Sequence, residues 1–193
     1  MAGTKKLRGK SWVFGDLMDV DWEICPFDIM NQVRNAGKAV TPEEMGKYCM
    51  TTVDPDFPKK VKQGDFIVAG DNFGYGHDHH HACVSVKGAG IAAVICESSN
   101  ANFIRNSLHN GLPVVACKGI KGKVKQGDDL EVDLSAGSVK DLTTGETFRF
   151  VPLPGFLLEM IEAGGLYPYT KERLKKGKSQ GPAPDLTSAG DRS

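Results

Sequence analysis

The sequence has no excess of charge of either sign. Its 193 residues include 24 lysines and arginines and 24 aspartates and glutamates, so the formal net charge is zero at pH 7. A chain without a positive field has no long-range attraction to nucleic-acid phosphates or to an anionic membrane surface. We therefore expect neither a nucleic-acid partner nor a membrane partner.

Long apolar runs are also missing. No segment approaches the roughly 20 apolar residues that span a bilayer. The basic residues 1–8 are followed by residues 12–16, WVFGD, rather than by an apolar segment of signal-peptide length. We expect a cytoplasmic protein. Because 40% of the residues are hydrophobic, the chain can bury one sizeable core.

Closely spaced cysteines are absent. The five cysteines are Cys25, Cys49, Cys83, Cys96 and Cys117. Their odd number and wide spacing suit neither a disulfide framework nor a Cys-x-x-Cys metal site, so we expect reduced and mostly buried thiols. Three cysteine ligands of an iron–sulfur cluster would include at least one close pair. We therefore expect no metal and no cofactor on this chain.

Short apolar runs alternate with helix-like stretches along the interior, which is typical of a mixed α/β domain. Strands are predicted at residues 66–69, 91–96 and 112–117, and helices at about 78–87 and 100–110. A β-meander at residues 130–134, 138–141 and 147–150 and a helix at 156–163 follow. We expect one domain over residues 1–175 and a disordered tail over residues 176–193, which are rich in glycine, serine and proline.

The hexapeptide KVKQGD occurs twice, at residues 60–65 and 123–128, each time before an apolar β run. Similarity between the two regions fades outside the hexapeptide, so we interpret it as a reused tight turn rather than a duplication. Glycine in each copy supplies the positive φ that such a turn needs.

Several segments resemble a known family. They are residues 15–21, 54–57, 68–82, 105–106, 111–113, 142–145 and 161–166. The longest, VAGDNFGYGHDHHHA at residues 68–82, resembles the signature of isopropylmalate isomerase small subunits and of the swivelling domain of aconitases. The resemblance covers roughly residues 8–175.

The resemblance implies an aconitase-type swivelling fold and the small subunit of a heteromeric hydro-lyase. Such an enzyme removes water from a hydroxy acid and adds it back at the neighbouring carbon. The implied substrate is a substituted malate. The leading candidate is 3-isopropylmalate, which implies a role in leucine biosynthesis, and dimethylmalate or citramalate are the next candidates. The implied partner is a large subunit carrying a 4Fe-4S cluster, in a heterodimer or heterotetramer.

The resemblance also suggests site residues. Gly74 and Gly76 would allow close approach of the backbone to substrate, and a helix starting near Asp78 would aim its free amides at a carboxylate. Arg105 matches an arginine of the family, although a surface ion pair is an equal alternative. Asp21 keeps its place in the early aspartate-rich loop and is a candidate catalytic residue.

The loop at residues 77–81, HDHHH, departs from the family pattern. His77 stands where the family has its serine base, and His79 stands where it has a carboxylate-binding arginine. Only His81 and the following alanine match. Histidine cannot reproduce the permanent charge and bidentate fork of arginine, so the identity of the substrate is open.

Three interpretations of this histidine loop remain. In the first, His77 is the general base, since imidazole titrates near neutral pH, and His79 and His81 bind substrate. In the second, His77 and His81 share a helix face and bind a metal ion. In the third, the loop is a solvated helix start in a subunit that binds its partner without acting on substrate.

Overall fold

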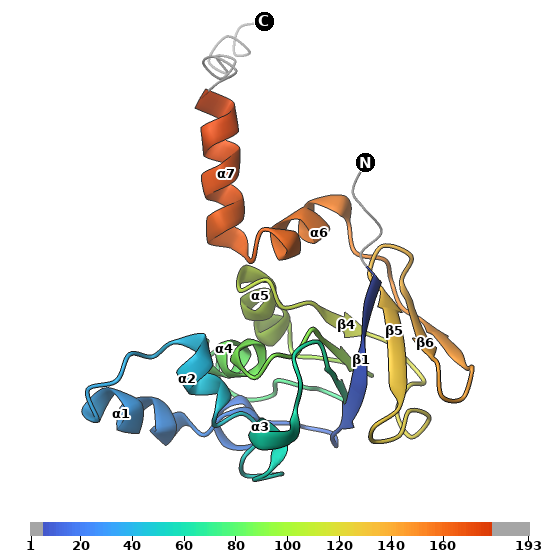
Figure 1. Cartoon of the computed structure of the whole chain (residues 1–193), viewed down its shortest axis with the longest axis horizontal. Coiled ribbons are helices and arrows are strands. Elements are labelled where there is room, and N and C mark those ends of the chain that lie inside the picture. Colours follow the sequence, from blue (N-terminus) through green and yellow to red (C-terminus); the bar gives the residue numbers. More distant parts are fainter. Residues whose placement is uncertain (1–5, 179–193) are drawn as a thin grey trace, which may run out of the picture.

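A seven-stranded mixed sheet forms the centre of the computed structural model, which describes residues 6–178 (Figure 1). The strand order is β4-β3-β2-β1-β5-β6-β7. The strands are β1 (Lys6–Val13), β2 (Phe66–Ala69), β3 (Ala93–Cys96), β4 (Val114–Ala116), β5 (Asp129–Asp133), β6 (Ser138–Asp141) and β7 (Thr147–Arg149). Strands β1 to β4 pair in parallel, and β1, β5, β6 and β7 pair antiparallel. The predicted α/β fold with a meander is confirmed.

Helices lie between the parallel strands and after β7. They are the π-helix η1 (Val20–Ile24), α1 (Phe27–Asn35), α2 (Pro42–Gly46), α3 (Phe57–Lys60), α4 (His81–Gly88), α5 (Ala101–His109), α6 (Gly155–Glu162) and α7 (Leu166–Lys178). Helix α7 projects away from the rest of the molecule (Figure 1). Among the helices of residues 6–178, none combines the length and the apolar character needed to cross a bilayer.

Two apolar clusters cover the two faces of the parallel strands. Every residue of β2 and β3 is buried. Phe66 and Val68 belong to the cluster shared with the meander, whereas Ile67 and Ala69 belong to the cluster shared with η1, α3, α4 and α5. Successive side chains of a strand point to opposite faces, so a strand covered on both faces has a continuous apolar sequence.

The two copies of the repeated hexapeptide form matching turns. Gly64 and Gly127 have φ values of +100° and +85°. The carboxylate of Asp65 accepts the Lys62 backbone N–H at 2.9 Å, and that of Asp128 accepts the backbone N–H three residues before it at 2.7 Å. The interpretation of the repeat as a reused turn is consistent with these bonds.

Two boundaries differ from the prediction. The helix predicted from residue 78 begins at His81, because the Asp78 carboxylate is bound by side chains of α5 and residues 77–80 form a loop. Helix α7 continues to Lys178, beyond the predicted start of the tail at residue 176. The remainder of the predicted tail, residues 179–193, lies outside the described residues.

Helices α2 and α4 touch through glycine. A Cβ atom added to Gly88 would lie 1.7 Å from the carbonyl oxygen of Pro42, and one added to Gly46 would lie 2.3 Å from the carbonyl carbon of Gly88. These distances are far inside van der Waals contact, so each helix needs a residue without a side chain at the crossing. The contact fixes α4, which carries the histidine loop at its start.

The five cysteines are all free and buried, as the sequence predicts. Burial raises the pKa of the Cys25 thiol to about 11 and that of the Cys83 thiol to about 12. The thiolate is the reactive form, so these groups are inert in the folded chain. We expect no thiol of the native protein to react with a disulfide reagent at pH 8 while the denatured chain loses all five. Fast labelling of any cysteine before unfolding would contradict this expectation.

Candidate active site

Asp21 lies in the first turn of η1, where Asp19 fixes its position. The Asp19 carboxylate accepts the Asp21 backbone N–H at 2.7 Å and caps the π-helix. The backbone of Asp19 pairs with that of Tyr75 in an isolated bridge. The capped π-helix therefore holds Asp21 beside the glycine-rich loop that leads to the histidines.

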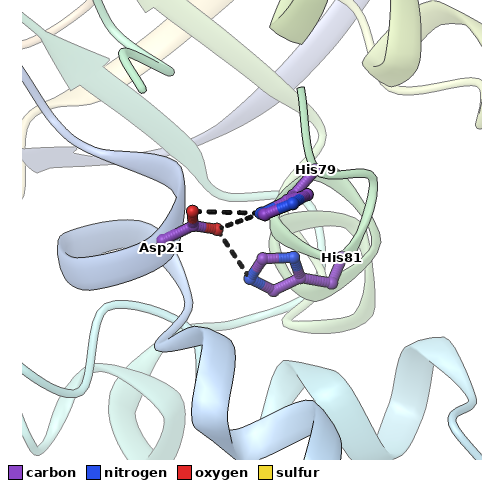
Figure 2. Close-up of side chains that lie close together, drawn as sticks. All are labelled: Asp21, His79 and His81. Carbon is purple, nitrogen blue, oxygen red and sulfur yellow. Dashed lines mark hydrogen bonds and ion pairs between the residues drawn. The ribbon is translucent and has the colours of Figure 1, made fainter. Parts of the chain in front are cut away.

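Three histidines surround the Asp21 carboxylate. Nδ1 of His77 lies 3.1 Å from Oδ2, and Nδ1 of His79 lies 2.8 Å from Oδ1 and 3.0 Å from Oδ2. Nε2 of His81 lies 3.7 Å from Oδ1. Figure 2 shows Asp21 pointing from η1 toward His79 and His81, which belong to the loop and the first turn of α4. The side chain of Asp21 is only 11% exposed, so its oxygens face these rings more than solvent.

The ring of His79 stacks with two neighbouring rings. Phe27 stacks on it with ring centroids 4.7 Å apart, and His77 stacks with centroids 5.4 Å apart. A carboxylate only accepts hydrogen bonds, so Nδ1 of His77 and Nδ1 of His79 each donate to Asp21. In the neutral form of either ring, the lone pair is then on Nε2, where it can accept a proton.

His81 is the buried member of the group. Its Nε2 donates to the Cys25 carbonyl oxygen at 2.8 Å, and its side chain is 3% exposed. Burial lowers the pKa of His81, while the bond to Cys25 and the charge of Asp21 oppose that shift. His81 is therefore a neutral residue that positions the loop and is unsuited to proton transfer at neutral pH.

Two hollows share Phe27 and His79 as a common wall. The Asp21 hollow has a volume of about 310 Å³ and is lined by Asp21, Trp22, Pro26, Phe27, Asp28, His77 and His79. The Arg34 hollow has a volume of about 370 Å³ and is lined by Phe27, Met30, Arg34, Val40, His79, His80, His81 and Val84. The first hollow brings together two carboxylates and two imidazoles, and the second adds apolar walls and one guanidinium.

Comparisons with known proteins give the family of the chain. Residues 23–118 match the aconitase C-terminal domain family. The chain is 46% identical over 172 residues to the isopropylmalate/citramalate isomerase small subunit of Methanocaldococcus jannaschii, covering 89% of this chain and 98% of the relative. It is 44% identical over 163 residues to 3-isopropylmalate dehydratase small subunit 1 of Methanopyrus kandleri, covering 83% and 89%. The chain belongs to the 3-isopropylmalate dehydratase small-subunit family.

A solved structure supports the same assignment. The crystal structure of 3-isopropylmalate dehydratase, leuD, from Methanocaldococcus jannaschii matches with a TM-score of 0.81 at 33% identity, covering 92% of this chain and all of the other. The expected family and fold are therefore confirmed. The domain match starts after Asp21 but includes the whole histidine loop.

Asp78 and Arg105, two of the predicted substrate-binding residues, bind each other. An Arg105 guanidinium nitrogen lies 2.7 Å from one Asp78 oxygen, and Asn106 donates to the other oxygen at 2.7 Å. The Arg105 and Asp78 side chains are 54% and 42% exposed. The ion-pair alternative for Arg105 is thus present in the structure, and a role in substrate binding stays a prediction.

Gly74 and Gly76 are tightly enclosed by the chain itself. A Cβ atom on Gly74 would lie 2.3 Å from the Phe103 ring, and one on Gly76 would lie 2.5 Å from the Asp19 carboxylate. Both glycines also have positive φ. The backbone at these two glycines thus lies close to side chains of the protein itself. The contact of Gly76 with the Asp19 carboxylate keeps Asp19 in place to cap η1. The amides expected to start near Asp78 belong instead to a helix that starts at His81.

Three site features were missed from the sequence. Phe27 stacks on His79, Trp22 lines the Asp21 hollow with 70% of its surface exposed, and the Cys25 carbonyl holds His81. The tryptophan one residue after a candidate catalytic aspartate is the one signal that sequence reasoning could have used. The other two contacts depend on the turn between η1 and α1. The alternative in which His77 and His81 share a helix face does not hold, because His77 precedes the helix.

Proposed function

We propose that this chain is the small subunit of a heteromeric hydro-lyase that dehydrates and isomerises a substituted malate. The names of its relatives support 3-isopropylmalate as the first candidate, which implies a role in leucine biosynthesis. A name that includes citramalate supports the smaller analogue, and the altered histidine loop keeps dimethylmalate a candidate. The active form is a heterodimer or a pair of heterodimers with the large subunit, in the cytoplasm.

The 4Fe-4S cluster of this proposal belongs to the large subunit, because residues of this chain do not fit it. Within residues 6–178, the side chains that come together as three potential ligands are Asp21, His79 and His81, and they include no cysteine. The five cysteines are buried with raised thiol pKa values.

Asp21 between His77 and His79 is the observation that carries the proposal. The substrate proton to be removed lies next to a carboxylate, so a base must be held in a defined position. His77 lines the Asp21 hollow and accepts that proton at Nε2, while Asp21 holds Nδ1 and stabilises the imidazolium that forms. His79 occupies the position of the family arginine and, when protonated, donates from Nε2 to a substrate carboxylate.

The proposal is tested by reconstituting the complex. The full chain is co-expressed with the large subunit from the same organism, and the complex is assayed for dehydration of 3-isopropylmalate, citramalate and 2,3-dimethylmalate by ultraviolet absorbance of the unsaturated acid. We expect turnover of at least one malate that needs both subunits. A stable complex without turnover of any of the three would instead favour a non-catalytic binding subunit.

Replacing Arg105 by alanine separates its two roles. An exposed ion pair contributes about 0–1 kcal/mol, so we expect the free energy of unfolding to change little. If Arg105 also donates to a substrate carboxylate, KM rises about tenfold or more, because hydrogen bonds to charged groups are worth about 1.5–3 kcal/mol. Arg8→Ala is the matched control, since it removes an exposed arginine that is paired with Glu131 far along the chain. Equal KM values for both variants would assign Arg105 to structure alone.

A further inference from the structure

We propose that Asp21, His79 and His81 form a binding site for one divalent transition-metal ion. Each residue offers one ligand atom, and these three atoms all lie within 4.8 Å of one another. Oδ1 of Asp21 is the centre of the group, with Nδ1 of His79 at 2.8 Å and Nε2 of His81 at 3.7 Å (Figure 2). The inference goes beyond the proposed hydro-lyase function.

The distances between the ligand atoms are close to those that an ion requires. Zinc lies about 2.0–2.2 Å from nitrogen and oxygen ligands, which places the ligand atoms of a tetrahedral site roughly 3–3.5 Å apart. The longer distances between ligand atoms of the three residues, which reach up to 4.8 Å, therefore have to shrink by about 1 Å when an ion binds. His79 allows this movement because it lies in the loop before α4 and is 39% exposed.

The donor set selects the class of ion. Two imidazoles and one carboxylate suit zinc and the neighbouring first-row transition metals, whereas magnesium and calcium prefer oxygen ligands. Three protein ligands also leave at least one position open. Asp21 and His79 both line the Asp21 hollow, so an open position faces that hollow.

Binding exchanges two hydrogen bonds for metal–ligand bonds. In each neutral ring the proton moves to the other nitrogen, from Nδ1 to Nε2 in His79 and from Nε2 to Nδ1 in His81, and the ion takes the lone pairs that this frees. Nε2 of His81 thereby leaves the Cys25 carbonyl. The hydrogen bond from His81 to the Cys25 carbonyl is neutral, and such a bond is weak compared with a metal–imidazole bond. The Cys25 segment stays anchored during the exchange, since its backbone N–H donates to the Val20 carbonyl.

Neighbouring groups already orient two of the ligands. Phe27 stacks on the His79 ring, and the Asp19 carboxylate holds the Asp21 backbone. Oδ2 of Asp21 faces Nδ1 of His77 at 3.1 Å, which leaves Oδ1 for the ion. Such outer contacts are the usual supports of metal-binding side chains.

A bound ion would place a permanent positive charge beside His79, where the family resemblance expects an arginine. Its open position would take an oxygen of a small hydroxy acid, through the carboxylate or the hydroxyl group. This extension to the ligand rests on the proposed function. The metal site itself does not.

The test measures metal binding to the full 193-residue chain without an activity readout. The chain is freed of metal with a chelator and titrated with Zn²⁺ by calorimetry and with Co²⁺ by visible spectroscopy. We expect one equivalent of each ion to bind. His79→Ala and Asp21→Asn should each weaken binding by more than about 100-fold, since loss of an outer contact alone costs 10–100-fold.

Two histidines outside the group serve as controls. His80→Ala removes a ring that faces Asn110 at 2.7 Å, and His109→Ala removes one at the end of α5. Both variants should bind zinc like the unsubstituted chain, and circular dichroism verifies that every variant is folded. Absence of a stoichiometric ion, unchanged affinity in folded His79→Ala and Asp21→Asn, or loss of binding in His80→Ala would overturn the proposal. Because turnover is not measured, these outcomes leave the hydro-lyase function standing.

Discussion

His77→Ala is expected to lower kcat of the reconstituted dehydratase by roughly 10²- to 10⁴-fold, the usual contribution of a general base. The ring that is lost faces Oδ2 of Asp21 through Nδ1 and is 80% exposed. KM should change little, because the base acts on the reacting proton and not on the carboxylates. Steady-state kinetics of the purified complex measure both constants.

The control for this variant is His80→Ala in the same loop. His80 lies outside the lining of the Asp21 hollow, and its Nε2 faces the Asn110 amide. Its kcat should stay within a few-fold of the unsubstituted complex. Undiminished turnover in His77→Ala would remove His77 from the role of base, and turnover that ignores every substitution in residues 77–81 would identify a subunit without a catalytic function.

Gly88→Ala is expected to lower the free energy of unfolding by about 3 kcal/mol, at the upper end for an overpacked site. The new methyl group would overlap the carbonyl oxygen of Pro42 at 1.7 Å, and backbone cannot move aside as a flexible side chain does. Helix α2 would have to shift away from α4. Denaturant titration of the full chain measures the change from the transition midpoint and slope.

Gly155→Ala is the matched control for the overpacked glycine. Gly155 is the first residue of α6, and a Cβ atom added there meets nothing within 4 Å. Its stability should stay the same or rise by a few tenths of a kcal/mol, because alanine favours helix. A loss below about 1 kcal/mol in Gly88→Ala would show that the α2–α4 contact yields without strain.

Strands that are buried on both faces could be predicted from the sequence. Strands with one polar face were harder to predict. β2 lies at the predicted residues 66–69, and β3 lies within the predicted run 91–96, because each is an unbroken apolar run. β1 was missed, since three of the first five residues of KLRGKSWV are charged and the segment has no unbroken apolar run. Its strand conformation is set by pairing with β2 and β5, which local sequence does not reveal.

The sequence predicts which residues belong to the candidate site better than it predicts how these residues are arranged. His77 and His79 were singled out as departures from a family loop and His81 as a match to it, and the structure brings all three to Asp21, more than 50 residues earlier in the chain. The helix start at residue 78 was wrong because the tertiary contacts of Asp78 override local helix preference. Contacts of this kind join distant segments, so no local pattern announces them.

The placement of β1 in the sheet sets the order in which the protein can assemble during synthesis. Residues 6–13 pair with β2 on one side, but on the other side they wait for residues 129–133. Until that late segment emerges, one edge of β1 is open, and open edges invite pairing with other chains. Lys6, Arg8 and Lys10 stand along this strand. These charged residues make β1 hard to predict from the sequence pattern, and they also protect the nascent chain from aggregation.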